Sequence, residues 1–195
     1  MEGFHLHHET FDYAPKNTTV FFVGGIQIDK FGNTNLIGIG KDYKRLDFRG
    51  PGSLGACTLA TLSGRYYIFT NAHERRVFVE KCDYISTFGW GSGGADARKK
   101  LGMPGGGPKC VVSSLCVLDF EEPKCVVSSL CVLDFEEETK AMRLKYLHQG
   151  VSIDEVVKNT GFKLIIPDEV ETTPPPTERE IEILRTRIDI KGELR

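Results

Sequence analysis

The sequence lacks a long apolar run, an excess of either charge and a cysteine spacing typical of disulfide-rich domains. Its 195 residues carry 25 basic and 27 acidic side chains, a formal net charge of −2. That balance gives no indication of binding to nucleic acid or to a membrane surface. The apolar runs are far shorter than a membrane span, and residues 1–18 are polar, with no basic region followed by an apolar one. We therefore expect a single cytoplasmic domain over residues 1–195 with a sizeable core.

Four of the six cysteines belong to a tandem duplication. Residues 108–122 read PKCVVSSLCVLDFEE, and residues 123–137 repeat them without a change. The C-x5-C spacing has no nearby histidine and does not match a zinc site, so buried free thiols are expected. A 15-residue period seen once is not a solenoid. We predict that one copy pairs in the sheet while the other forms a protruding hairpin or an irregular excursion. The four cysteines concerned are Cys110, Cys116, Cys125 and Cys131.

Two groups of histidines invite a functional interpretation. His5, His7 and His8 could share a metal ion, but they have no companion carboxylate or cysteine cluster, and an ordinary surface is expected instead. His73 and Glu74 could act as an acid–base pair if both face a cleft. The alternative for them is a solvated turn in which Glu74 meets a neighbouring cation.

The stretch from Thr19 to Gly55 is punctuated by glycines beside apolar strands. Strands are expected over residues 20–28 and 35–39, joined by a tight turn over residues 29–33. A second bend, residues 50–55 (GPGSLG), leads into small residues suited to close packing or a short helix. Two such bends suit a site where backbone N–H groups approach a ligand, although the glycines could serve packing alone.

The rest of the chain alternates strands with two capped helices. Further strands are expected over residues 66–70, 77–86 and 142–148. Ser152 with Glu155 forms a capping box that opens a helix, and Gly161 stands where a C-cap belongs. Residues 168–195 form a proline-rich connection and a terminal helix that begins at Thr177. Its apolar residues recur at helical spacing, so we expect this helix to dock on the body.

Several motifs in order resemble one known family. GGIQIDKFGNTN, RGPGSLG, NAHERRVFVEKCDYISTFGW, LGMPGGGPKCVVSS and SIDEVVKNTGF are similar to segments of the class I CoA-transferases, in particular β-subunits of the glutaconate CoA-transferase type. The resemblance runs from about Thr19 to Ile188. It implies a CoA-transferase-like three-layer α/β sandwich with a mixed, mostly parallel sheet, of which this chain resembles the C-terminal portion.

The resemblance also implies a reaction and a partner. In this family a glutamate of the β part attacks an acyl-CoA thioester, and CoA then passes to a second carboxylic acid such as a dicarboxylate. The site lies against an α-subunit, and coenzyme A is a substrate, so neither a cofactor nor a metal is expected. The glutamate belongs to a Glu-x-Gly motif upstream of the matched region. The chain begins too late to contain it, so no catalytic residue is assigned and the chain alone is expected to be inactive.

The substrate-binding residues implied by the resemblance come from the glycine-rich segments. Ser53 replaces a glycine that the family usually has. Asn33 and Asn35 could bind substrate oxygens or only stabilise the turn, and the basic loop with Arg98, Lys99 and Lys100 could meet phosphates or be a solvated linker. The alternatives are a decarboxylase or acyl-CoA hydrolase subunit of the same fold, and a non-catalytic fragment. The residues assigned to substrate binding are Gly24, Gly25, Asn33, Asn35, Gly50, Gly52 and Ser53.

Overall fold

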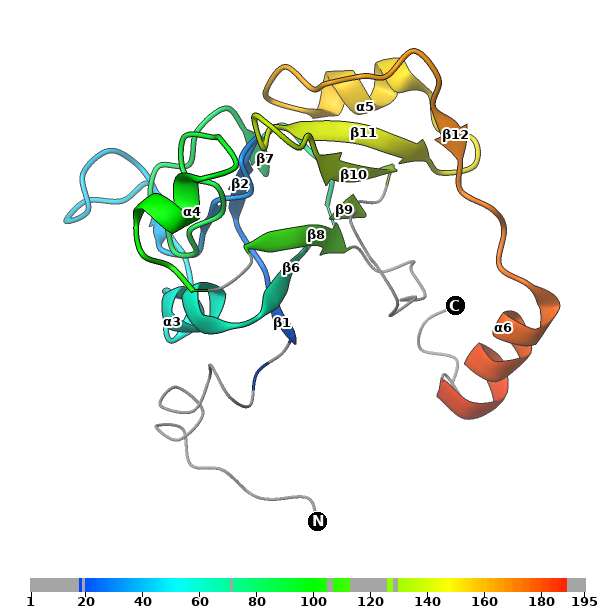
Figure 1. Cartoon of the computed structure of the whole chain (residues 1–195), viewed down its shortest axis with the longest axis horizontal. Coiled ribbons are helices and arrows are strands. Elements are labelled where there is room, and N and C mark those ends of the chain that lie inside the picture. Colours follow the sequence, from blue (N-terminus) through cyan, green and yellow to red (C-terminus); the bar gives the residue numbers. More distant parts are fainter. Residues whose placement is uncertain are drawn as a thin grey trace.

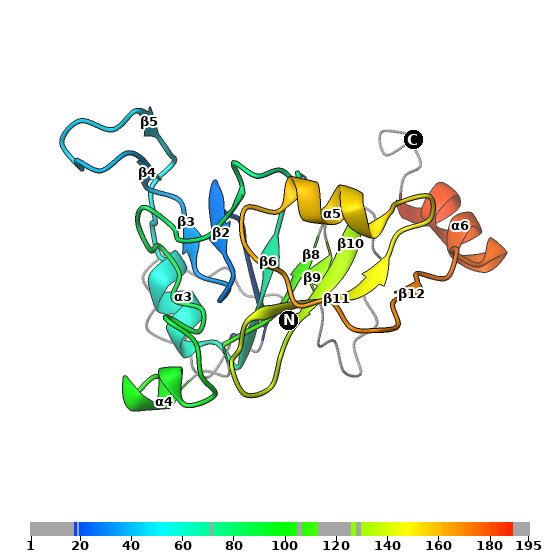
Figure 2. The ribbon, with the colours of Figure 1, turned by 90° about the horizontal axis from the view of Figure 1, so that it is seen from above.

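The structure, a computed structural model, describes residues 18, 20–70, 72–104, 107–112, 126–127 and 130–188. It shows an α/β protein with short helices around small sheets (Figures 1 and 2). The elements are β1 (Val20–Val23), β2 (Gln27–Asp29), β3 (Thr34–Asn35), β4 (Gly38–Ile39), β5 (Phe48–Arg49), α3 (Ala56–Leu62), β6 (Arg65–Phe69), β7 (Phe78–Val79), α4 (Ala97–Lys100), β8 (Pro108–Val112), β9 (Val126–Val127), β10 (Cys131–Phe135), β11 (Met142–Leu147), α5 (Ile153–Asn159), β12 (Glu171–Thr172), α6 (Glu178–Ile183) and the π-helical turn η1 (Leu184–Ile188).

The strands are distributed over four sheets. Their orders are β1-β6-β8, β12-β11-β10-β9, β3-β2-β7 and β4-β5. Parallel and antiparallel neighbours both occur, as expected for a mixed sheet, but the described strands do not form one continuous sheet and parallel pairs do not predominate. The reason is local. The run over residues 20–28 is broken at Gly24–Gly25, so β1 and β2 enter different sheets.

The core lies where the sheets meet. β6 is the central strand of the parallel sheet, and its Tyr66 and Ile68 are fully buried. They share one apolar cluster with Ile28 of β2, Leu133 of β10 and Leu144 of β11. Burial of these side chains provides most of the driving force for folding. The hairpin β2–β3 is thereby fixed at the boundary between the sheets.

Helix α5 begins where its sequence predicts, but of the predicted capping box only the bond to the Ser152 side chain is present. The Ser152 side chain accepts a hydrogen bond from the N–H of Glu155, and Val156 packs fully buried against the core. In both views α5 lies along β11 (Figures 1 and 2). The C-cap is Thr160 in an extended conformation, so the prediction that Gly161 caps the helix is wrong. Gly161 is required for another reason: a Cβ there would overlap the carbonyl oxygen of Phe78, which accepts its N–H at 2.7 Å.

Both copies of the duplication contribute strands. The first five residues of the first copy form β8, and the second copy contributes β9 and β10. The prediction that only one copy pairs in a sheet is therefore wrong. Residues 113–125 lie outside the described residues, as do His5, His7 and His8.

The terminal helix forms but does not dock. Thr177 and Glu180 make the predicted reciprocal capping box. However, α6 buries none of its residues and lies apart from the body at one end of the molecule (Figures 1 and 2). Its extended lead, which includes Pro174–Pro176, carries it away from the sheets, so the predicted docking is wrong. None of the helices in the described ranges is long and apolar enough to cross a bilayer.

Candidate functional site: a hydrogen-bonded glycine bend

The turn between β2 and β3 is built around Asp29 and Asn33. The Asp29 carboxylate accepts the N–H groups of Phe31 and Asn33 and the Asn33 side-chain amide, at 2.9–3.1 Å. Burial raises the pKa of Asp29, and these hydrogen bonds oppose that rise. Gly32 closes the turn at φ +70, where a side chain would be strained and would meet the Phe135 ring. The turn is thus specified by side chains within five residues of one another.

Asn33 extends the turn to a distant loop. Its side-chain nitrogen also donates to the carbonyl of Gly91 at 2.8 Å, and its Oδ1 accepts the N–H groups of Gly89 and Gly91. The residue is 1% exposed. Both atoms of the amide are therefore engaged within the chain, and the side chain acts as a cross-link between the hairpin and the loop at Gly89–Gly91.

Asn35 plays a comparable part at the other end of β3. Its side-chain nitrogen donates to Gln27 Oε1 and to the carbonyl of Gly38, both at 2.7 Å, and its Oδ1 accepts the N–H groups of Ile37 and Gly38. Gln27 in turn contacts Asp83, whose Oδ2 also accepts the N–H of Gly40 at 3.1 Å. Sequence reasoning missed Gln27 and Asp83. The only sequence signal was a polar residue in the middle of an apolar strand.

The glycine bend is held against this hairpin by Leu36 and Ser86. The N–H of Gly52 donates to the Leu36 carbonyl at 2.8 Å, while the Leu36 N–H and the Ser53 hydroxyl both donate to Ser86 Oγ, at 2.8 and 2.9 Å. A Cβ on Gly50 would overlap the Leu36 carbonyl oxygen, so that position requires glycine. Ser86 lies 33 residues from Ser53, and nothing local in the sequence indicated it.

The bend presents backbone N–H groups rather than side chains. Among the described residues, none accepts a hydrogen bond from the N–H of Ser53, Leu54 or Gly55. Leu54 has a φ of +42 and is 91% exposed, so a branched apolar residue is held in a conformation that normally favours glycine. Backbone strain of this kind costs of order 1–3 kcal/mol and is concentrated at functional sites. The arrangement is suited to binding an anionic oxygen.

Gly24 and Gly25 lie between β1 and β2, just before the hairpin. Gly25 lines a pocket of about 290 Å³, whose wall is mostly apolar and includes the β4–β5 ribbon that leads into the bend. Its one charged lining residue is Arg76, which forms an exposed ion pair with Glu74. The lining residues are Gly25, Ile26, Ile39, Phe48, Thr70, Ala72, Arg76 and Val77.

His73 and Glu74 do not form an acid–base pair. His73 is buried, stacks on Phe78 with ring centroids 4.2 Å apart, and contacts the Thr160 hydroxyl through Nε2 at 3.0 Å. Burial lowers its pKa to about 4, so the ring is neutral at pH 7. Glu74 is bonded to Arg76 instead. Glu74 therefore meets a neighbouring cation as the alternative predicted, but His73 is buried in the core and not part of a solvated turn.

The basic loop separates into one buried cation and two exposed ones. Arg98 is buried and donates to the carbonyls of Phe88 and Ala60, at 2.6 and 2.8 Å. Burial lowers its pKa. Lys99 and Lys100 remain exposed on α4. Arg98 therefore stabilises the loop, and only the two lysines are accessible to a phosphate. Within the described ranges, no group of three or more His, Cys, Asp or Glu side chains could hold a metal ion.

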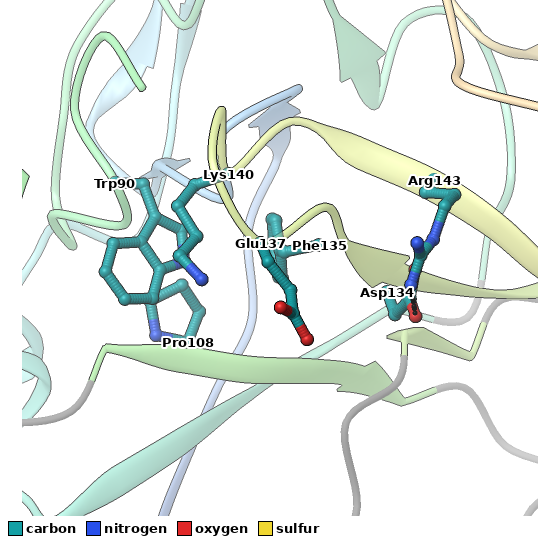
Figure 3. Close-up of a pocket in the computed structure, with 7 residues that line it drawn as sticks. All are labelled: Trp90, Pro108, Asp134, Phe135, Glu137, Lys140 and Arg143. Carbon is teal, nitrogen blue, oxygen red and sulfur yellow. Dashed lines mark hydrogen bonds and ion pairs between the residues drawn. The ribbon is translucent and has the colours of Figure 1, made fainter. Parts of the chain in front are cut away.

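A second pocket, of about 330 Å³, contains none of the residues assigned to substrate binding. It lies between β8 and β10 and is lined by both apolar and charged side chains (Figure 3). The Lys140 ammonium lies 5.1 Å from the centre of the Trp90 ring, and Arg143 is paired with Asp134 through two hydrogen bonds. The lining residues are Trp90, Pro108, Asp134, Phe135, Glu137, Lys140 and Arg143.

Comparisons with known proteins agree on one family. Residues 5–159 match the coenzyme A transferase family. The chain is 36% identical over 166 residues to the β-subunit of 3-oxoadipate CoA-transferase from Pseudomonas knackmussii, covering 85% of this chain and 57% of that protein. It is 37% identical over 176 residues to the β-subunit of glutaconate CoA-transferase from Acidaminococcus fermentans, covering 89% and 58%.

Solved structures show the same fold. The crystal structure of the Acidaminococcus fermentans glutaconate enzyme superposes with a TM-score of 0.74 at 33% identity, covering 96% of this chain and 64% of that one. Rhodococcus jostii IpdAB gives a TM-score of 0.77 at 25% identity, covering 99% and 70%. The chain thus spans about three fifths of the length of the curated CoA-transferase subunits that it matches. On the family match and the shared fold, this chain belongs to the coenzyme A transferase family.

Proposed function

We propose that the chain forms part of the β-subunit of a heteromeric CoA-transferase that moves CoA between an acyl-CoA and a carboxylic acid such as a dicarboxylate. The observation that carries the proposal is the bend at Ser53–Gly55, where three successive N–H groups have no acceptor among the described residues. Attack on a thioester generates a tetrahedral oxyanion, and preorganised N–H donors stabilise that charge. The bend supplies such donors without side-chain motion.

A pocket lined in part by the β4–β5 ribbon, which leads into the bend, supports the substrate class. The pocket beside Gly25 offers an apolar wall for an acyl or pantetheine chain and one cation, Arg76, at its edge. An exposed ion pair such as Arg76–Glu74 is worth little, so Arg76 can be shared with an anionic group at low cost. Coenzyme A acts here as a substrate, with no separate cofactor, and we expect the reaction to take place in the cytoplasm.

We propose in addition that this chain binds a partner polypeptide that resembles the α-subunit of a CoA-transferase. The two CoA-transferase relatives named above are β-subunits, and the apolar Leu54 projects from the bend into solvent. A side chain of this size beside the N–H donors is suited to packing against a second polypeptide that closes the site. No glutamate in the sequence stands in a Glu-x-Gly context. We therefore expect this chain on its own to catalyse no transfer.

The test compares two glycines that share a positive φ and open space around the Cβ position, one in the bend and one far from it in the sequence. Gly52 and Gly150 both have positive φ values, +91 and +79, and a Cβ at either position meets open space. Gly52→Ala and Gly150→Ala should cost similar stability, about 1–2 kcal/mol, because alanine is strained at a positive φ. In the complex purified through a tag on this chain, Gly52→Ala should reduce CoA transfer from acetyl-CoA to glutarate at least tenfold, and Gly150→Ala should not. Equal activity of the two variants would contradict an oxyanion role for the bend.

Hydrolysis is the second candidate. A cholesterol ring-cleaving hydrolase subunit from Rhodococcus jostii is 26% identical over 195 residues, and IpdAB of that organism covers 99% of this chain. The same assay separates the two reactions. Free CoA released without an acceptor acid would indicate hydrolysis of the thioester, a different bond from the ring that the Rhodococcus relative is named for, whereas product formed only with an acceptor would indicate a transferase.

A further inference from the structure

The two identical 15-residue units adopt different strands. Each residue of the first unit corresponds to the residue 15 positions later. Val111–Val112, the end of β8, are therefore equivalent to Val126–Val127, which form β9. One dipeptide sequence occupies two places in the fold.

The two valine pairs lie at the edges of two different sheets. In β8 the valine pair lies parallel to β6 and ends the three-stranded sheet. In β9 it lies antiparallel to β10 and ends the four-stranded sheet. A strand has two hydrogen-bonding edges, and each of these strands uses one of them for its ladder. β8 and β9 also contact each other and lie side by side in Figure 1.

We propose that a chain with one unit would form a single strand here, and that the duplication replaces this strand by two, β8 and β9. One continuous mixed sheet is thereby split into two. With one unit, the same valine pair would join β6 on one edge and β10 on the other. The resulting order would be β1-β6-β8-β10-β11-β12. This inference does not depend on the proposed function.

The pocket in Figure 3 lies at this division. One side of the pocket is formed by Pro108 at the start of β8, and the opposite side by Asp134 and Phe135 at the end of β10. Among the described residues, β9 comprises Val126–Val127 and does not extend between them. Continuing its register against β10 would set the position of Pro108 opposite Glu136. With a single unit, the strands on the two sides of the pocket would therefore be joined by backbone hydrogen bonds. The pocket is thus a consequence of the duplication and not a substrate site.

A deletion tests the proposal without a choice of register, because removal of any 15 consecutive residues within 108–137 gives the same sequence. Deleting residues 113–127 shortens the connection between β8 and β10 from 18 residues to 3. Closing the shorter loop costs less conformational entropy, so the Tm should rise by about 5 °C. Trp90, the only tryptophan, lines the pocket, so its quenching by acrylamide should fall at least twofold. An unchanged quenching constant or a lower Tm would overturn the proposal.

A matched pair of proline variants in the full chain gives an independent readout by amide hydrogen exchange. Proline cannot donate to a ladder. The N–H groups of successive strand residues point to opposite edges, so each valine pair is replaced as a whole. In the full chain, the double variant Val111→Pro/Val112→Pro should accelerate exchange in β6 at least tenfold and leave β10 unchanged, whereas Val126→Pro/Val127→Pro should do the reverse. In the deletion chain, Val111→Pro/Val112→Pro should accelerate exchange in both strands. If this double variant in the full chain already affects both strands, the sheet is not divided and the proposal fails, whether or not the deletion chain folds.

Discussion

Replacing Asn33 by alanine tests whether this side chain holds the fold or binds substrate. The change removes the donor to Asp29 and to the Gly91 carbonyl, and it leaves the N–H groups of Gly89 and Gly91 without their acceptor. Each buried polar group left unsatisfied costs about 1–3 kcal/mol, and Gly91 is partly solvated, so a total of about 3–5 kcal/mol is expected. For a chain of this length the Tm should fall by roughly 10–15 °C.

The pH dependence of this variant gives a second, independent check. The pKa of Asp29 is already raised by burial, and the Asn33 amide is the largest contribution that lowers it. Without that amide the pKa rises further, so the folded variant binds more protons than the unfolded chain over a wider range above about pH 3.9. Stability is lost as the pH rises through that range. The deficit relative to the unsubstituted chain should therefore be larger at pH 7 than at pH 4.

Urea unfolding of the full chain at both pH values measures these effects. Asn159→Ala is the matched control, because Asn159 is only half-buried and its side chain makes one hydrogen bond, an exposed one to the Glu155 carbonyl at 3.0 Å. Its stability should change by no more than about 0.5 kcal/mol. A free energy of unfolding within about 1 kcal/mol of the unsubstituted chain for Asn33→Ala, with altered turnover in the complex, would refute the structural role and favour a substrate contact.

Three further predictions concern single residues. Gly161→Ala should lower the free energy of unfolding by at least about 3 kcal/mol, because the new Cβ would overlap the Phe78 carbonyl oxygen. Gly102→Ala, where the Cβ position has no neighbour within 4 Å, should remain folded, and thermal unfolding compares the two variants. The unsubstituted chain should lose up to about 3 kcal/mol of unfolding free energy as the pH falls from 6.5 to about 4, because the His73 ring has a lower pKa in the folded state and the unfolded chain is protonated first. His73→Gln should abolish this loss, which urea titrations at pH 7 and 4.5 measure. Arg98→Met should cost about 2–4 kcal/mol without weakening the binding of CoA to the complex, measured by calorimetry.

The local parts of the fold could be predicted from the sequence. Both capped helices begin at the expected residues because the Ser152 and Thr177 caps bond to N–H groups three residues away. The turn over residues 29–33 is specified in the same way by Asp29 and Gly32. In each case the residues that determine the structure are close together in the sequence, so the pattern contains the necessary information.

The parts that depend on distant contacts could not be predicted. Gly161 looks like a helix cap in sequence, yet its role is set by the carbonyl of Phe78 across the fold. The terminal helix has the apolar spacing of a docked helix, but periodicity describes a face and not whether another element covers it. Asn33 and Asn35 looked equally suited to substrate or turn, and only the positions of Gly89, Gly91 and Gln27 show where their hydrogen bonds go.

The candidate site shows why its most visible side chains are not the ones proposed to meet the substrate. The Asn35 side chain bonds to the backbone of Ile37 and Gly38, and Ser86 Oγ accepts the N–H of Leu36. The Leu36 carbonyl in turn accepts the N–H of Gly52. The fixed bend then leaves the N–H groups of Ser53, Leu54 and Gly55 available for a ligand oxygen, at the cost of the strained Leu54 backbone. Preorganised donors of this kind need no reorganisation when charge develops, which is the condition for stabilising a transition state. Substitution of a supporting side chain should therefore lower stability and turnover together, whereas Gly52→Ala should lower turnover far more than stability.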